Sequence, residues 1–78
     1  MKTIIQQINN MITSLNECRK YYAGDIEEQH IIDKQQWVLN RAKYLHHKGK
    51  KIDIEHLSSL VTHLRFSCNF SDLQKKLK

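Results

Sequence analysis

Residues 1–22 read MKTIIQQINNMITSLNECRKYY, with apolar side chains that recur in alternating steps of three and four. This spacing puts one continuous apolar stripe on a single face of an α-helix, in the a and d positions of a heptad repeat. Ile5 and Ile12 widen the stripe on one side, to the width typical of a helix in a bundle. We therefore expect the first helix to pack against its own bundle on one side and against a second copy of the chain on the other. The residues predicted to form this oligomer interface are Ile4, Ile5, Ile8, Met11, Ile12 and Leu15.

Two glycines punctuate the rest of the chain, which has no proline. We expect Gly24 to take the left-handed conformation that closes the first helix, and Asp25 and Glu28 to form a capping pair that opens the second. The same pattern recurs at Gly49, with Asp53 as the predicted N-cap of a third helix. The two breaks therefore predict three main helices.

The predicted architecture is all-α, and it forms one domain over residues 1–78. Its helices span about residues 2–22, 26–48 and 54–68, and a short fourth turn is predicted near Ser71. A chain this short buries a limited share of its surface, so its own core contributes only a few kcal/mol of stability. We expect dimerisation to complete the three-helix bundle.

The chain carries thirteen Lys and Arg against eight Asp and Glu, a net charge of +5. Six of its ten lysines gather in two short runs, over residues 48–51 and 75–78. Runs of this length are usually the solvated ends of helices. A positive balance also attracts nucleic acid, anionic lipid or an acidic protein surface.

The two cysteines, Cys18 and Cys68, both fall on predicted apolar stripes. A free cysteine in that position behaves as a small hydrophobic residue, so we expect both to be buried and reduced; a bridge between the first and third helices is the alternative. No apolar run is long enough to span a bilayer, and the first ten residues are too polar for the core of a signal peptide. These features predict a cytoplasmic protein.

Five histidines and two cysteines raise the question of a metal site. Their spacing argues against one: His46 and His47 are adjacent and diverge on a helix, and His56 and His63 lie two turns apart. The chain also lacks a glycine-rich phosphate loop and a cysteine with a histidine base at helical spacing. We expect no metal, no cofactor and no enzymatic activity.

The second predicted helix carries a stripe of cationic and aromatic residues at helical spacing, on a different face from its apolar stripe. It could be a protein-binding hot spot, because Trp, Tyr and Arg dominate such sites. It could also track a nucleic-acid backbone, or it could simply widen the core beneath folded cationic stems. The residues predicted to bind a partner there are Lys34, Trp37, Arg41, Tyr44 and Lys48.

From Glu27 to about Leu73 the chain has an acidic start, a long helix, a charged turn with glycine, and then apolar residues at helical spacing. These last residues are Ile52, Ile54, Leu57, Leu60, Val61 and Leu64. The arrangement resembles the YmgB/AriR type of small enterobacterial biofilm-regulator and two-component connector proteins. The resemblance implies a dimeric helical regulator that acts through protein contacts, and it transfers no individual functional residue.

Together these patterns predict a small non-enzymatic helical adaptor or regulator that binds another protein. An antirepressor-like or inhibitory role, as in a phage or other mobile element, fits a chain of this kind. The alternative is a small basic nucleic-acid-binding protein that uses the stripe on the second helix.

Overall fold

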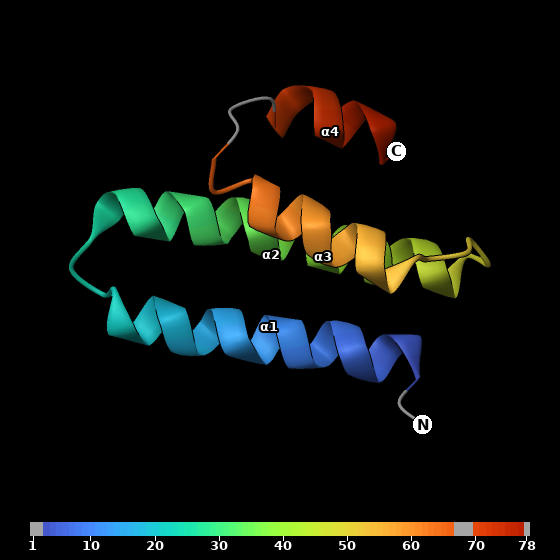
Figure 1. The fold of residues 1–78 in the computed structure, drawn as a ribbon, viewed down its shortest axis with the longest axis horizontal. Helices are drawn as coiled ribbons and strands as arrows, with labels where there is room; N and C mark the ends of the chain where they lie inside the picture. Colours follow the sequence, from blue (N-terminus) through green and yellow to red (C-terminus); the bar gives the residue numbers. More distant parts are fainter. Residues whose placement is uncertain (1–2, 67–69, 78) are drawn as a thin grey trace.

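The computed structural model describes residues 3–66 and 70–77, and this part of the chain contains four α-helices. They are α1 (Ile4–Tyr21), α2 (Ile26–His47), α3 (Ile54–His63) and α4 (Phe70–Lys76). α1 and α2 form an antiparallel hairpin, α3 returns along α2, and α4 lies on the side of α2 and α3 away from α1 (Figure 1). The all-α prediction is therefore confirmed, with a short helix where the fourth turn was expected.

The core lies where α1, α2 and α3 meet. Its buried members are Ile8, Val38, Leu39, Ala42, Leu57, Val61 and Leu64. These residues come from all three helices at the spacing that the apolar pattern predicts. Packing of the amphipathic faces supplies most of the stability of helices this short.

The apolar stripe of α1 is used largely within the chain. Ile8 is completely buried by its own chain, so it has no surface left to contact a second copy. The stripe residues that pack, partly buried, against the same core are Ile4, Met11, Ile12 and Leu15. Ile5 is also half-buried. The predicted oligomer interface thus coincides with the face that α1 turns toward the rest of its own bundle.

Gly49 closes α2 as the sequence predicts. Its φ is +91°, its N–H donates to the carbonyl of His46 at 3.1 Å, and the N–H of Lys50 donates to Leu45 at 3.0 Å. This is the Schellman arrangement, in which a glycine beyond the C-cap satisfies the last free carbonyls. Asp53 then caps α3, as predicted.

Gly24 does not take the left-handed conformation, so that prediction is wrong. A side chain closes α1 instead: Nε2 of Gln29 donates to the carbonyls of Arg19 at 3.0 Å and Tyr22 at 2.8 Å. Because these carbonyls already have donors, the turn needs no residue with positive φ. The guanidinium of Arg19 in turn donates to Oε1 of Gln29 at 2.8 Å and fixes the amide.

The predicted capping pair at the start of α2 is only half formed. Oδ1 of Asp25 accepts the N–H of Glu28 at 3.2 Å, as expected. The Glu28 carboxylate does not reach back to the cap, because it accepts a hydrogen bond from the guanidinium of Arg65 at 2.9 Å. This ion pair joins the start of α2 to the end of α3.

Gln35 interrupts the apolar stripe of α2 and is almost fully buried. Its Nε2 donates to the carbonyl of Val61 at 2.9 Å. The acceptor lies in the last turn of α3, where carbonyls lack partners within the helix. A polar side chain in the core therefore ties the end of α3 to α2.

Two other predictions change. α3 ends at His63 rather than near Cys68, because a tight turn follows in which Arg65 and Phe66 donate to carbonyls three residues back. Cys18 is exposed rather than buried. A straight helix drifts by about 20° per heptad, which turns a seam that continues to a third repeat away from its partner. Cys68 lies outside the described residues.

Candidate protein-binding groove

α4 packs on the aromatic and cationic stripe of α2. The rings of Trp37 and Phe70 meet edge to face, with centroids 5.5 Å apart. Nε of Arg41 donates to the carbonyl of Leu77 at 2.6 Å, at the end of α4 where carbonyls lack partners. Two of the residues predicted to bind a partner therefore hold a helix of their own chain, and both are half-buried.

The rest of the stripe stays accessible. The Tyr44 side chain is 48% exposed, with the Arg41 guanidinium 4.8 Å and the Lys48 ammonium 5.5 Å from its ring centroid. Both distances suit cation–π contacts. Lys34, nearer the start of α2, is half-buried, and Lys48 is exposed. The structure thus divides the predicted stripe into a part under α4 and a free part at the end of α2.

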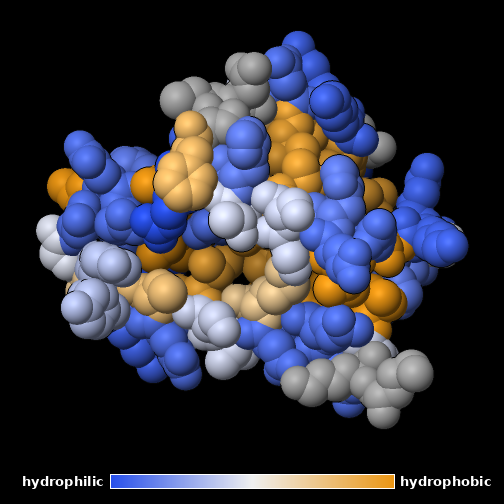
Figure 2. Space-filling model, in the orientation of Figure 1, coloured by the Kyte–Doolittle hydropathy of each residue, from blue (hydrophilic) through white to orange (hydrophobic). Residues whose placement is uncertain are grey.

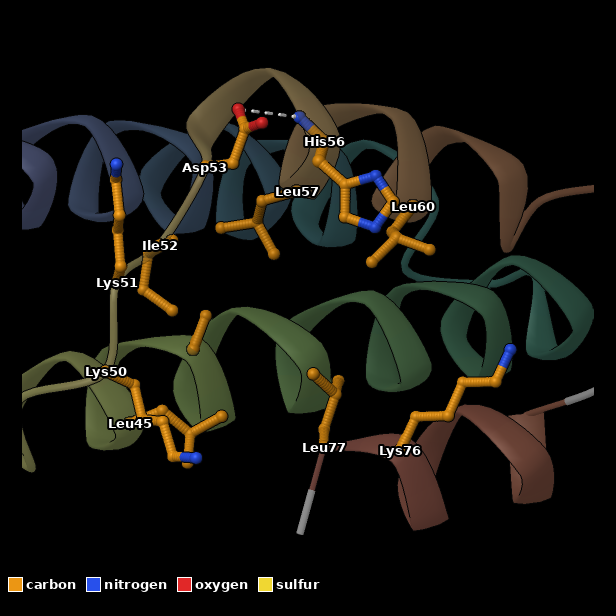
Figure 3. A pocket seen from close by; sticks show the side chains of 11 residues that line it. Leu45, Lys50, Lys51, Ile52, Asp53, His56, Leu57, Leu60, Lys76 and Leu77 are labelled. Carbon is orange, nitrogen blue, oxygen red and sulfur yellow. Dashed lines mark hydrogen bonds between the residues drawn. The ribbon is translucent and has the colours of Figure 1, made fainter.

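A groove opens beside α4, between α2 and α3 (Figure 3). Its volume is about 280 Å³. Its floor is apolar and combines residues from α2, the α2–α3 connection, α3 and the end of α4. These residues are Ala42, Leu45, Ile52, Leu57, Leu60 and Leu77. Apolar surface is visible between hydrophilic side chains next to α4 in the space-filling view (Figure 2).

Three lysines border the groove. Lys50 and Lys51 lie on the α2–α3 connection, and Lys76 comes from α4. Asp53 also lines the groove, but Oδ1 of its carboxylate accepts the backbone N–H of His56 at 3.3 Å as the N-cap of α3 (Figure 3). The rim is therefore positively charged over an apolar floor.

The sequence places these lysines in two runs that look like solvated helix ends, and it gives no sign that they meet. They line one groove because α4 folds back over α2, which carries Lys76 to the same groove as Lys50. The available signal was the pair Leu73 and Leu77 in the fourth turn, both of which pack against the core. A turn with its own apolar face docks on the bundle rather than extending into solvent.

The size of the groove indicates what it can hold. Pockets for small molecules and cofactors usually have volumes from about 300 to 1,000 Å³ and enclose most of their ligand. At about 280 Å³, this groove lies at the lower edge of that range. It suits one or two apolar side chains of a macromolecular partner, with negative charge beside them to meet the lysines.

The end of the molecule at the α1–α2 turn, opposite the α2–α3 connection, exposes large apolar side chains. Ile26 is 75% exposed and Phe66 is 76% exposed, and the ion pair between Glu28 and Arg65 holds their segments together. The hydrogen bond that Arg65 donates to Glu28 raises the pKa of Arg65, so the guanidinium stays positively charged across the physiological range. Tyr21 is 82% exposed and lies at the end of α1, beside the α1–α2 turn.

Two general findings concern the described residues. Among residues 3–66 and 70–77, no group of three or more His, Cys, Asp or Glu side chains could hold a metal ion. None of the helices in that part of the chain has the length and apolar character to cross a membrane. Comparisons of the chain with protein-family models, with curated proteins and with solved structures gave no match.

Proposed function

We propose that this chain is a small non-enzymatic adaptor or regulator that binds an acidic, apolar segment of another protein in the groove between α2, α3 and α4. The observation that carries the proposal is the combination of an apolar floor with a rim of three lysines. An apolar anchor in a small pocket provides most of the affinity in such contacts. Complementary charge around it provides specificity and speeds encounter.

The side chains around the groove support binding rather than chemistry. Asp53 is engaged as the N-cap of α3, and the lysines stand at the rim rather than against one another. Tyr44 and Lys48, which the sequence selected as partner-binding residues, lie toward the same end of α2 as Leu45 on the groove floor. They could extend the contact beyond the groove.

The nucleic-acid alternative gains less from the geometry. Base stacking needs accessible aromatic faces, and Trp37 is half-buried against Phe70. Lysines on the rim could contact phosphates, but an apolar floor offers nothing to a sugar–phosphate backbone. We therefore treat nucleic-acid binding as a competing outcome of the experiment below.

The test uses a fluorescein-labelled amphipathic peptide with leucines on one helical face and glutamates beside them. A control peptide carries lysines in place of the glutamates. We expect the acidic peptide alone to raise the fluorescence anisotropy when the protein is added. Leu60→Ala should weaken binding about tenfold. Lys50→Glu should weaken binding by a smaller factor than Leu60→Ala, and its effect should be larger at low salt than at high salt.

His30→Ala is the matched control, because His30 is exposed on α2 and does not line the groove. Equal binding of the two peptides would contradict the proposal. So would binding of a labelled single-stranded or duplex oligonucleotide that Lys50→Glu abolishes while neither peptide binds. That second result would favour the nucleic-acid alternative.

A further inference from the structure

We propose that the groove of one chain also receives the α1–α2 turn of a second copy, with the side chain of Ile26 on the groove floor and Glu27 facing the lysine rim. This proposal rests on the proposed function, because it assumes that the groove is a protein-docking site. It adds the identity of one occupant. It also gives self-association a different location from the α1 stripe.

The segment from Asp25 to Glu27 has the chemistry that the groove requires. Ile26 is the first residue of α2 and is 75% exposed, and both of its neighbours are exposed acids. A large aliphatic side chain between two carboxylates is the complement of an apolar floor with a lysine rim. Oδ1 of Asp25 accepts the N–H of Glu28.

A single exposed apolar residue is ordinary on a protein surface and would carry no argument. Ile26 is not the only large apolar side chain exposed in this part of the molecule. Phe66 and Tyr21 lie at the same end of the molecule and are even more exposed. Their segments are joined by the α1–α2 turn and by the ion pair between Glu28 and Arg65. Exposed apolar surface larger than a single side chain is typical of a protein-interaction site. We call this end, formed by Tyr21, Ile26 and Phe66, the apolar tip.

The positions of the two surfaces determine the kind of assembly. The α1–α2 turn and the α2–α3 connection lie at opposite ends of the longest axis, which extends 38 Å (Figure 1). A tip in the groove of a neighbour therefore leaves the neighbour's tip and the first chain's groove both free. Contacts between two different surfaces of the same chain produce open, head-to-tail rows unless a rotation closes them into a ring. The acidic segment of another protein would compete with a second copy for the groove.

The test is sedimentation velocity over a wide range of concentrations, with charge reversal at each surface. Glu27→Lys puts a lysine against the lysine rim, and Lys51→Glu puts a glutamate against the acidic segment. Each variant alone should self-associate about fivefold more weakly than the wild type. An equimolar mixture of the two should recover association, because every contact between unlike chains then pairs opposite charges.

Ile26→Ala tests the apolar half of the contact and should weaken self-association about tenfold. The side chain is exposed, so this variant should unfold at the same temperature as the wild type. Ile5→Glu on the α1 stripe is the comparison, and it should leave self-association unchanged if the protein remains folded.

A wild type that stays monomeric at every concentration would overturn the proposal. So would self-association that Ile5→Glu removes and Ile26→Ala leaves unchanged. The peptide experiment separates this failure from that of the proposed function. If the acidic peptide binds while the chain stays monomeric, the groove is a docking site and only the self-association is wrong.

Discussion

The two glycine turns look alike in the sequence and differ in the structure. Each has a glycine followed closely by an aspartate N-cap. Gly49 adopts a positive φ and closes α2 through backbone hydrogen bonds, whereas the turn at Gly24 is closed by the side chain of Gln29. The turn at Gly49 borders the lysine-rimmed groove, and the turn at Gly24 belongs to the apolar tip. The same local pattern thus supports two ends of opposite character, because residues distant in the sequence decide what surrounds each turn.

Replacement of Gln29 by alanine should have the largest effect on this comparison. It removes two hydrogen bonds to the carbonyls at the end of α1 and leaves the Arg19 guanidinium without one of its acceptors. The Tyr22 carbonyl keeps the N–H of Asp25 as a donor, but the Arg19 carbonyl loses its side-chain donor. An unpaired, partly buried carbonyl costs about 2 kcal/mol of unfolding free energy. Urea denaturation would measure the loss. His30→Ala is the control and should change stability by less than about 0.5 kcal/mol. An equal effect of both changes would mean that Gln29 does not close α1.

The two glycines themselves offer a matched pair. Gly49→Ala should lower stability by about 1 kcal/mol, because an L-residue is strained at a φ of +91°. Gly24→Ala should leave stability unchanged or raise it by up to about 1 kcal/mol, since its φ is not positive and a Cβ there meets no atom within 4 Å. Thermal unfolding of both variants would measure the difference. Similar losses of stability at the two positions would indicate that both glycines have a positive φ, as the sequence pattern predicts.

Arg65→Ala should have the smallest effect, below about 1 kcal/mol, because an exposed ion pair is weak. The bonded Glu28 raises the pKa of Arg65, so the pair contributes stability below the unfolded-state pKa and loses it only in strongly alkaline solution. The effect should therefore be constant around neutral pH and shrink at high salt. Denaturation of wild type and variant at two salt concentrations would show this. A loss that grows with salt would contradict the assignment.

The helix class, three of the four helix positions and the Asp25 and Asp53 caps could be predicted from the sequence, because they depend on local spacing and local hydrogen bonds. Which surface covers the α1 stripe could not be predicted from the sequence. Periodicity shows which face of a helix is apolar but does not show whether its own chain or another chain covers that face. The completely buried Ile8 shows that the chain itself covers the centre of the stripe.

None of the residues predicted to bind a partner lines the groove. Trp37 and Arg41 were selected as contact residues, and they do make contacts, but with α4 of their own chain. The groove was not predicted, because its lysines come from segments about 25 residues apart and border one groove only when α4 folds back. Tertiary proximity of this kind leaves no local signature. The exposure of Ile26 was also unpredicted, since the apolar pattern does not show whether neighbouring helices extend far enough to cover the first turn of α2.

The most direct test of the central claim is a titration of the ¹⁵N-labelled protein with the acidic amphipathic peptide, followed by amide chemical shifts. The groove account predicts that the largest changes fall on residues 50–60 and on the end of α4, with the centre of α1 unaffected. Changes concentrated along α1, or none at all at saturating peptide, would contradict it.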